Sequence, residues 1–303
     1  MRLAALRALA NVQVDFDAPL GARTTYRVGG AVRALVTLRD ASELDDVAEA
    51  LAACEMPMLA VGQGSNLLVN EGLHDIVAVV LEGSFATLDV RDDVDAVVVR
   101  VGGALALPVA ARRLAREGVV GFEWAVGVPG SFGGAVAMNA GGHGSDVAAS
   151  LVSVRCWRGG STATLPTSEL AFGYRTSALR DGDLVLEGEL RLARGDADTA
   201  NTRVREIVQW RRAHQPGGAN AGSVFRNPPH DAAARLIESV GAKGLRFGSA
   251  AVSEKHANFI QADGGGLAHD VFTLMTLVRA KVREETGITL ELENRLVGFE
   301  ECA

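Results

Sequence analysis

The spacing of apolar residues predicts alternating helices and strands in the first half of the chain. Ser42 supplies a capping side chain for a helix whose apolar residues between Leu44 and Ala52 fall on one face. A second, short helix lies between Pro108 and Gly118. Short apolar runs typical of strands occupy Met58–Val61, Ile76–Leu81 and Val94–Val101. We therefore expect mixed α and β structure.

The second half of the chain is also predicted to contain both helices and strands. Strand-like stretches at Leu151–Trp157 and Leu184–Leu192 precede a polar segment, residues 193–198, which marks the clearest domain boundary. Beyond it the pattern predicts a helix through Val204, Ile207 and Val208 that ends before Pro216, and a helix that Asp231 caps. A long helix with an apolar face ends at Gly287. Two strands follow it, Ile288–Leu292 and Arg295–Val297.

Two loops are rich in glycine and poor in side chains that could form a core. Residues 62–66 read GQGSN, and residues 127–144 read GVPGSFGGAVAMNAGGHG. Glycine leaves main-chain N–H groups uncovered, and successive N–H groups form an anion-binding concavity. The pair therefore suggests one extended phosphate ligand such as a dinucleotide, with tight turns as the alternative. Neither loop carries the Rossmann G-x-G-x-x-G or the Gly-Lys-Ser/Thr of a P-loop.

Composition narrows the class of protein. With 303 residues and 48% hydrophobic content, the chain can bury a large core and form two or three subdomains. No apolar run is long enough for a membrane span or a convincing signal peptide, so we expect a soluble cytoplasmic protein. Three scattered cysteines and six histidines without ligand spacing favour neither disulfides nor a bound metal. A net charge of −7 disfavours nucleic acid, although the basic excess between Arg211 and Lys255 suits a small anion or a solvated face.

Three residues outside the glycine loops are candidates for chemistry. Ser223 follows a glycine in the basic region and could donate a proton or act as a nucleophile, although Gly-Ser is more often a turn. Glu293 shares one face of a predicted strand with Glu291 and Arg295, and a solvent-facing edge is the alternative. Arg175 could bind a carboxylate or pack against Tyr174.

Taken together, these motifs resemble the UDP-N-acetylenolpyruvoylglucosamine reductase family, flavoenzymes of peptidoglycan precursor synthesis. The resemblance runs from about Thr24 to Gly298 and rests on eight segments in the family's order. They are TTYRVGG at 24–30, VGQGSNLLV at 61–69, GVPGSFGGAVAMNAG at 127–141, FGYR at 172–175, RR-x-x-QP at 211–216, AGSVFRNP at 221–228, SEKHANFI at 253–260 and ENRLVG at 293–298.

The resemblance implies an α+β fold. It implies an FAD-binding region of the vanillyl-alcohol-oxidase type in two subdomains, residues 1–84 and 85–197, followed by an α+β substrate-binding domain at 198–303. The FAD pyrophosphate would lie against the two glycine loops. The implied cofactor-binding residues are Gly62, Gln63, Gly64, Ser65, Asn66, Val128, Pro129, Gly130, Ser131, Gly133, Gly134 and Asn139. Covalent relatives carry a linking histidine in the first loop; this chain has none there, so we expect non-covalent FAD.

The implied reaction is the NADPH-dependent reduction of an enolpyruvyl double bond on a UDP-sugar. Such a bond accepts a hydride only if the charge that builds beside the carboxylate is stabilised and then quenched by a proton. The resemblance assigns the proton to Ser223 and charge stabilisation to Arg175 and Glu293. It implies substrate contacts from Tyr174, Arg175, His214, Arg226 and Asn227. It also implies roles in cell-wall biogenesis, cell shape and cell division, and it leaves the oligomeric state open.

Two positions depart from the family pattern. His214 stands where the family often has a lysine that contacts the diphosphate, so we expect weaker or pH-dependent binding there. His143 stands where the short-loop form commonly has a tyrosine, and the short stretch from Arg175 to Ser223 assigns the chain to that form. The competing hypotheses are a flavin oxidase of the same fold and a non-catalytic nucleotide-sugar sensor.

Overall fold

The computed structural model describes residues 3–299, which form two compact units. The first unit contains residues 3–16, 33–63 and 75–211, and the second contains residues 17–32, 64–74 and 212–299. Each unit is therefore assembled from separated stretches of the sequence. Mixed helix and strand content confirms the predicted α+β class.

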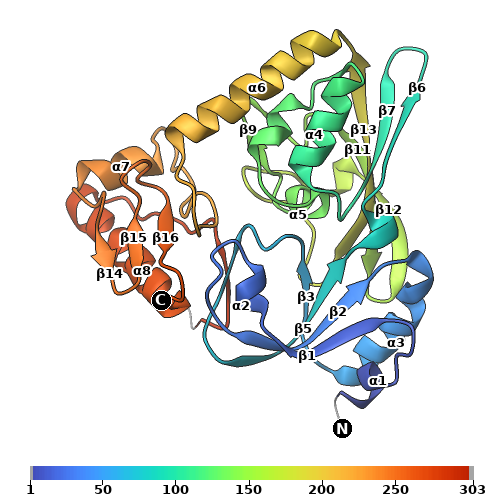
Figure 1. Cartoon of the computed structure of the whole chain (residues 1–303), viewed down its shortest axis with the longest axis horizontal. Coiled ribbons are helices and arrows are strands. Elements are labelled where there is room, and N and C mark those ends of the chain that lie inside the picture. The colour runs from blue at the N-terminus through green and yellow to red at the C-terminus, as the bar shows by residue number, and fades with distance from the viewer. Residues whose placement is uncertain (1–2, 300–303) are drawn as a thin grey trace. The chain divides into compact units, whose positions relative to one another are not determined.

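A small sheet of order β1-β2-β5-β3 lies mostly in the first unit, and residues 17–18, 31–32 and 73–74 at the strand ends are assigned to the second (Figure 1). Its strands are β1 (Gln13–Ala18), β2 (Ala31–Leu38), β5 (Leu73–Leu81) and β3 (Met58–Val61), and β3 pairs with β5 in parallel. The strand β2 is buried along most of its length, as expected of a strand covered on both faces. Helices α1 (Ala4–Arg7) and α3 (Leu44–Cys54) contribute Leu6 and Val47 to the core beside it.

The cap of α3 differs from the prediction. The side chain of Asp40, and not of Ser42, accepts a hydrogen bond at the start of this segment, from Ser42 N–H at 3.0 Å. Glu43 reaches back to the N–H of Asp40, which completes a capping box over the 3-10 turn η1 (Ala41–Glu43). The α-helix therefore begins at Leu44, directly after the 3-10 turn that Asp40 caps.

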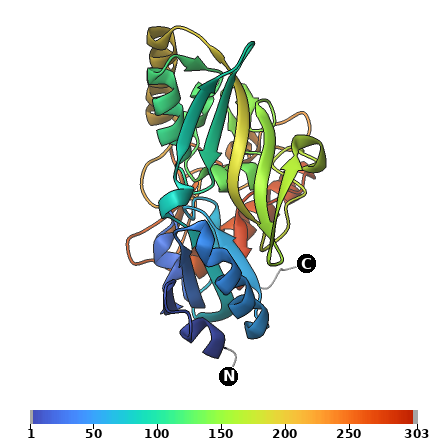
Figure 2. The same ribbon diagram turned by 90° about the vertical axis from the view of Figure 1, so that its right-hand side faces the viewer.

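A larger sheet forms the rest of the first unit, in the order β12-β11-β13-β7-β6 with β8 also paired to β13 (Figure 2). Its strands are β6 (Leu88–Asp92), β7 (Val97–Gly102), β8 (Val119–Val120), β11 (Leu151–Arg158), β12 (Ser161–Pro166) and β13 (Leu184–Arg194). The helices around it are α4 (Leu107–Arg116), α5 (Phe132–Ala137) and α6 (Ala197–His214), of which α6 runs past Arg211 into the second unit's part of the chain. The antiparallel pairs leave β12 and β6 at the edges.

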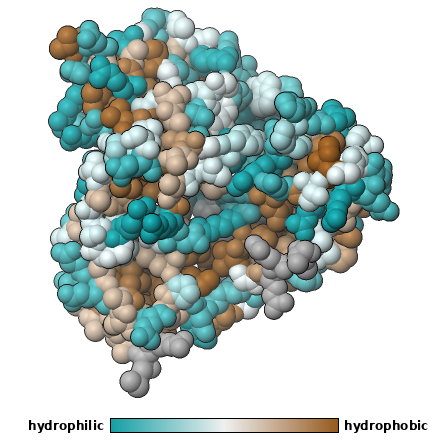
Figure 3. Space-filling model, turned by 180° about the vertical axis from the view of Figure 1, so that it is seen from behind, coloured by the Kyte–Doolittle hydropathy of each residue, from teal (hydrophilic) through white to brown (hydrophobic). Residues whose placement is uncertain are grey.

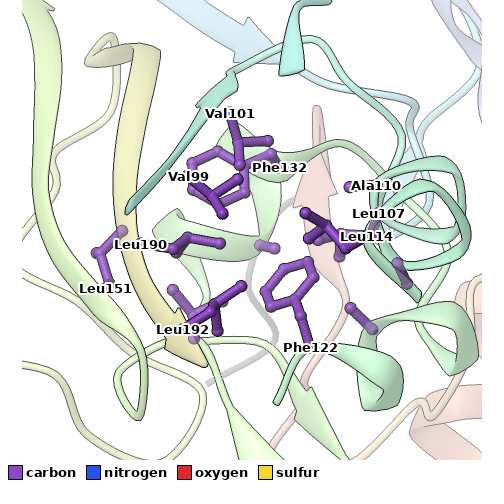
Figure 4. Close-up of a cluster of buried hydrophobic side chains, with 14 of the residues drawn as sticks. Val99, Val101, Leu107, Ala110, Leu114, Phe122, Phe132, Leu151, Leu190 and Leu192 are labelled. Atoms are coloured by element: carbon purple, nitrogen blue, oxygen red, sulfur yellow. The ribbon is translucent and has the colours of Figure 1, made fainter. Parts of the chain in front are cut away.

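The core of this sheet includes Phe132 from the second glycine loop (Figure 4). Phe132 is fully buried in the same cluster as Val99, Val101 and Leu107. The expectation that this loop lacks core side chains was therefore wrong for its middle, which forms the short helix α5. Burial of this large ring fixes the loop on the sheet.

The second unit packs helices against a three-stranded sheet of order β14-β15-β16. Its elements are α2 (Leu20–Arg23), β4 (Leu67–Val69), α7 (Ala233–Ser239), β14 (Arg246–Phe247), β15 (Ala250–Val252), β16 (Ile260–Ala262), α8 (Ala268–Thr286) and β17 (Arg295–Val297). The apolar face predicted for α8 is buried, and the helix ends at Gly287 with φ +74°, as predicted. Strand β17 pairs with β4 in parallel.

Three further predictions were wrong in detail. Residues 288–292 form no strand, and only Leu292 makes an isolated bridge, with Phe225. Val94 is 94% exposed in the turn before β7 and does not begin that strand. At α7 the side chain of Asn227 accepts from the first helical N–H, Ala233, whereas Asp231 accepts from Ala232 just before the helix.

Hydrophilic and hydrophobic residues are interspersed over the face of the molecule seen in Figure 3. Among the described residues, no helix combines the length and the apolar character that a membrane crossing requires.

Candidate active site

The second glycine loop lies against the segment that joins β7 to α4. The N–H of Leu107 donates to Gly130 O at 3.0 Å, and the N–H of Phe132 donates to Leu105 O at 2.8 Å. Gly130 has φ +119°, a backbone conformation that residues other than glycine seldom adopt. The loop is thus held by main-chain bonds on both sides of Ser131.

Ser131 connects the two glycine loops within the first unit. Its Oγ accepts from Gly134 N–H at 3.3 Å and caps α5. A Cβ placed on Gly62 would lie only 2.3 Å from that Oγ. An alanine at 62 would therefore displace the Ser131 hydroxyl, which shows how closely the two loops approach here. Their joint role in binding a ligand stays a prediction.

The same loop presents donors suited to an anion. Gly130 and Ser131 are buried, yet their main-chain N–H groups donate no hydrogen bond to any residue that the structure describes. Buried N–H groups are nearly always paired, so two adjacent orphans indicate a partner supplied from outside the chain. A dinucleotide pyrophosphate would satisfy them, so the residues present fit FAD.

Arg175 lies in a tight turn of the first unit. It has φ +60° between the bridged residues Gly173 and Thr176, and its Nη2 donates to Gly141 O at 3.0 Å. Its guanidinium carbon stands 5.2 Å from the centre of the Tyr174 ring. A guanidinium that lies over an aromatic ring still has donors for a carboxylate, so this geometry suits both roles expected of Arg175.

Asn139 holds this turn in place. Its Nδ2 donates to Gly173 O at 3.0 Å, and its Oδ1 accepts from Ala148 N–H at 3.1 Å. The residue is buried and adopts φ +40°. The Asn139 carboxamide therefore ties the second glycine loop to the Tyr174–Arg175 turn; its contact with a cofactor stays a prediction.

The second unit places Ser223 and Glu293 on paired segments. The N–H of Glu293 donates to Val224 O at 2.8 Å, and the N–H of Arg226 donates to Glu291 O at 2.9 Å. The isolated bridge between Phe225 and Leu292 lies between these two bonds. Two residues that are 70 positions apart in the sequence are thus brought onto adjacent main-chain segments.

Asn258 fixes the segment that carries Ser223. Its main-chain O accepts from Val224 N–H at 2.9 Å, its Oδ1 accepts from Phe225 N–H at 3.0 Å, and its Nδ2 donates to Phe225 O at 2.8 Å. The Ser223 side chain is half-buried and has no hydrogen-bond partner within residues 3–299. Its hydroxyl is therefore available to a substrate.

The remaining residues predicted to contact the substrate belong to the second unit and differ in their exposure to solvent. Arg226 is half-buried, its Nη1 lies 3.8 Å from Glu291 Oε2, and its Nε is buried without a partner in the described chain. Asn227 is exposed and uses its Oδ1 to cap α7. His214 is exposed in the last turn of α6. Nothing in these positions tests their assignment to substrate.

His143, a departure from the family pattern, lies in the first unit against Trp210, with ring centres 5.1 Å apart and the planes nearly perpendicular. Desolvation by burial lowers the pKa of His143, and the nearby Arg203 and Arg211 lower it further. The described residues contain no group of three or more His, Cys, Asp or Glu side chains that could hold a metal ion.

Comparison with known proteins first defines the class. Residues 32–163 match the FAD binding domain family. The structure of Physcomitrella patens BBE-like 1 shares the fold at 13% identity and a TM-score of 0.59, over 95% of this chain and 90% of that chain. The chain therefore has the FAD-binding fold of the vanillyl-alcohol-oxidase type, as the sequence predicted.

The particular family follows from closer relatives. Residues 214–297 match the C-terminal domain of UDP-N-acetylenolpyruvoylglucosamine reductase. The reductase 2 of Symbiobacterium thermophilum is 41% identical over 92% of this chain and 91% of its own length, and that of Acidiphilium cryptum is 40% identical over 95% and 92%. The crystal structure of the Thermus caldophilus reductase matches at 34% identity and a TM-score of 0.79, over 95% of this chain and 99% of that chain. The chain belongs to the UDP-N-acetylenolpyruvoylglucosamine reductase family.

Proposed function

We propose that the chain reduces the enolpyruvyl group of UDP-N-acetylglucosamine enolpyruvate to give UDP-N-acetylmuramate, with NADPH as the electron donor and FAD as a bound, non-covalent cofactor. Family membership over more than nine-tenths of the chain supports the reaction. The observation that carries the catalytic assignment is the pairing of the Ser223 and Glu293 segments.

The cofactor would be held by the glycine loops. Gly130 and Ser131 would donate their unpaired N–H groups to the pyrophosphate, and residues 62–66 would contribute the other loop. When bound, FAD supplies two-electron redox chemistry between NADPH and the substrate. No histidine in residues 62–66 is available for a covalent link.

Ser223, Arg175 and Glu293 would carry the chemistry of the substrate double bond. The methylene carbon gains a hydride, and the carbon beside the carboxylate gains a proton, which we assign to the Ser223 hydroxyl. Arg175 has the planar donor set that pairs with a carboxylate, and such pairing would stabilise the charge that builds next to it. We assign Glu293 to the same stabilisation. A serine hydroxyl is a weak acid, so proton transfer from Ser223 requires surroundings that hold the hydroxyl in one position.

The other substrate contacts are assigned to Tyr174, His214, Arg226 and Asn227. Arg226 is the best supported of them, because its buried Nε has no partner in the described chain and a ligand acceptor would satisfy it. The product of this reaction is a peptidoglycan precursor, so we place the protein in the cytoplasm, with roles in cell shape and cell division.

One assay tests the reaction. The purified protein with its FAD is mixed with NADPH, and absorbance is followed with and without UDP-N-acetylglucosamine enolpyruvate. Consumption of NADPH that requires the enolpyruvyl substrate, together with UDP-N-acetylmuramate detected by mass spectrometry, would support the proposal. Reduction of the flavin by a sugar or alcohol, with oxygen as the electron acceptor and without NADPH, would identify an oxidase, and binding of the UDP-sugar without turnover would identify a sensor.

A further inference from the structure

Asn294, the residue after Glu293, has a carboxamide that contacts three other stretches of the second unit. Its Nδ2 lies 2.8 Å from Asn66 Oδ1, 3.1 Å from Ala221 O and 3.4 Å from Ser223 O. Its Oδ1 lies 3.4 Å from the hydroxyl of Tyr26, which donates to it. One side chain therefore joins the Ser223 segment, the first glycine loop and the TTYRVGG segment.

This cluster is sealed from solvent. Asn294 is 5% exposed, and Tyr26 is fully buried. Burial raises the pKa of the Tyr26 phenol above its ordinary value, so the hydroxyl stays neutral and remains a donor. A buried carboxamide whose donors and acceptor are all engaged is rigid, and removing it leaves the carbonyl groups of residues 221 and 223 without that donor.

Asn66 extends the cluster back to Glu293. Its Nδ2 donates to Glu293 O at 2.9 Å, and its main-chain O accepts from Arg295 N–H at 2.9 Å. Asn66 thus bonds to the main chain of Glu293 and Arg295, and the Asn294 carboxamide bonds both to Asn66 and to the main chain of Ser223. No functional assignment made above uses Asn294 or Tyr26.

We propose that Asn294 is a positioning residue for the reduction, and that its carboxamide, held by Tyr26 and Asn66, sets the distance between the Ser223 hydroxyl and the Glu293 carboxylate. This inference rests on the proposed function, because it acts through Ser223 and Glu293. Proton delivery depends steeply on placement, and a misplacement of about 1 Å can cost about 100-fold in rate. The reduction of FAD by NADPH uses neither residue.

The test separates the two half-reactions of the FAD-loaded protein by stopped flow. In Asn294→Ala, oxidation of the reduced protein by the enolpyruvyl substrate should slow about 10- to 100-fold, whereas reduction by NADPH should keep its rate. The solvent deuterium isotope effect on the slowed step should rise, because proton transfer becomes more limiting. Tyr26→Phe, which keeps the carboxamide and removes only its donor, should show a smaller effect in the same step.

Glu71→Gln provides the matched control. The Glu71 carboxylate accepts from Ala268 and His269 N–H at the start of α8, and it makes none of the hydrogen bonds that hold Asn294, although Glu71 follows Asn66 in the same stretch of the second unit. This variant should lose thermal stability and leave both half-reactions unchanged. Hydrogen exchange, measured before substrate is added, should increase at residues 221–226 and 291–295 in Asn294→Ala and not in Glu71→Gln.

A double variant distinguishes the inference from the reaction assignment. If Asn294 acts through Ser223, adding Asn294→Ala to Ser223→Ala should slow the substrate step far less than the two single effects multiplied together. Equal slowing of both half-reactions in Asn294→Ala, multiplicative effects in the double variant, or unchanged exchange at 221–226 would overturn the inference alone. An unchanged substrate step in Ser223→Ala would instead overturn the proposed role of Ser223.

Discussion

The main-chain N–H of Glu293 donates to the carbonyl oxygen of Val224, the residue directly after Ser223, at 2.8 Å. This bond brings together the main-chain segments of the two candidate catalytic residues of the second unit. Only residues 224–226 and 291–293 pair, so neither segment forms a regular strand here. Short pairing of this kind fixes position over a few residues and leaves the adjoining loops free to shape a binding site.

Gly62→Ala should weaken the first unit and its hold on FAD. The new methyl would lie 2.3 Å from Ser131 Oγ. Ser131 would have to rotate away, and loss of its cap on Gly134 N–H costs about 1 kcal/mol. Urea denaturation and the fraction of FAD retained on gel filtration measure the two effects.

Gly264→Ala is the control for that experiment, because a Cβ there meets nothing within 4 Å and the residue is exposed. It should change neither stability nor retention of FAD. If Gly62→Ala behaved like Gly264→Ala, the contact between the glycine loops would not be needed for the cofactor.

The cofactor should be released intact by acid or heat. The expectation follows from the residues of the first glycine loop, which are Gly62, Gln63, Gly64, Ser65 and Asn66 and include no histidine. After precipitation, the yellow colour and the mass of FAD should appear in the supernatant. Flavin mass retained on peptides of the denatured chain would contradict a non-covalent cofactor.

Acid should destabilise the fold in part through His256. Burial lowers the pKa of this histidine and Lys243 lowers it further, whereas a hydrogen bond to its own main chain and the charge of Glu238 oppose the shift without cancelling it. The unfolded chain then binds a proton more readily than the folded chain, so the free energy of unfolding is highest above the ordinary histidine pKa of about 6.5 and falls as the pH drops below it. His143 contributes in the same direction.

His256→Gln should therefore lose less stability than the unaltered protein between pH 7.5 and 5.5, a window on either side of the ordinary pKa of about 6.5. Urea midpoints at the two pH values measure the difference. The same drop in both proteins would remove His256 from the explanation of acid sensitivity.

The sequence predicted those elements whose pattern is long or carries a strong terminator. The face of α8 and its end at Gly287 follow from five apolar residues at helical spacing and one glycine able to adopt φ +74°. The strands β3, β11, β13 and β17 were likewise predicted from their apolar runs. Strand β2 was missed, although its nearly continuous apolar run, AVRALVTL, is the signal of a strand buried on both faces.

The errors came from local signals that tertiary contacts overrode. Ile288, Leu290 and Leu292 alternate like a strand, but the facing segment contains Gly222 at φ +75° and then Pro228, so it offers a partner over only a few residues. The error at Ser42 has a local cause instead: Asp40 accepts from Ser42 N–H, so Ser42 lies inside the 3-10 turn η1 and Asp40 is its cap.

Some residues of the candidate site could be predicted from the sequence, and others could not. Motif resemblance selected Ser223, Arg175 and Glu293, but no local pattern distinguishes Asn294 as a residue that joins three segments. Its partners at 26, 66 and 221 are distant in the sequence, so only the fold reveals them. The sequence signal available was the position of Asn294 directly after Glu293 in the ENRLVG segment, and its burial became apparent only in the structure.

The most direct test of the account is the stopped-flow analysis of Ser223→Ala. Reduction of the bound FAD by NADPH should proceed at close to the normal rate, because the serine has no part in it. Oxidation by the enolpyruvyl substrate should slow by about 10²–10⁴-fold, the usual cost of losing a positioned general acid, and Ser223→Cys should recover part of the loss. Equal slowing of both half-reactions would show that Ser223 is a structural residue and would contradict its role as the proton donor.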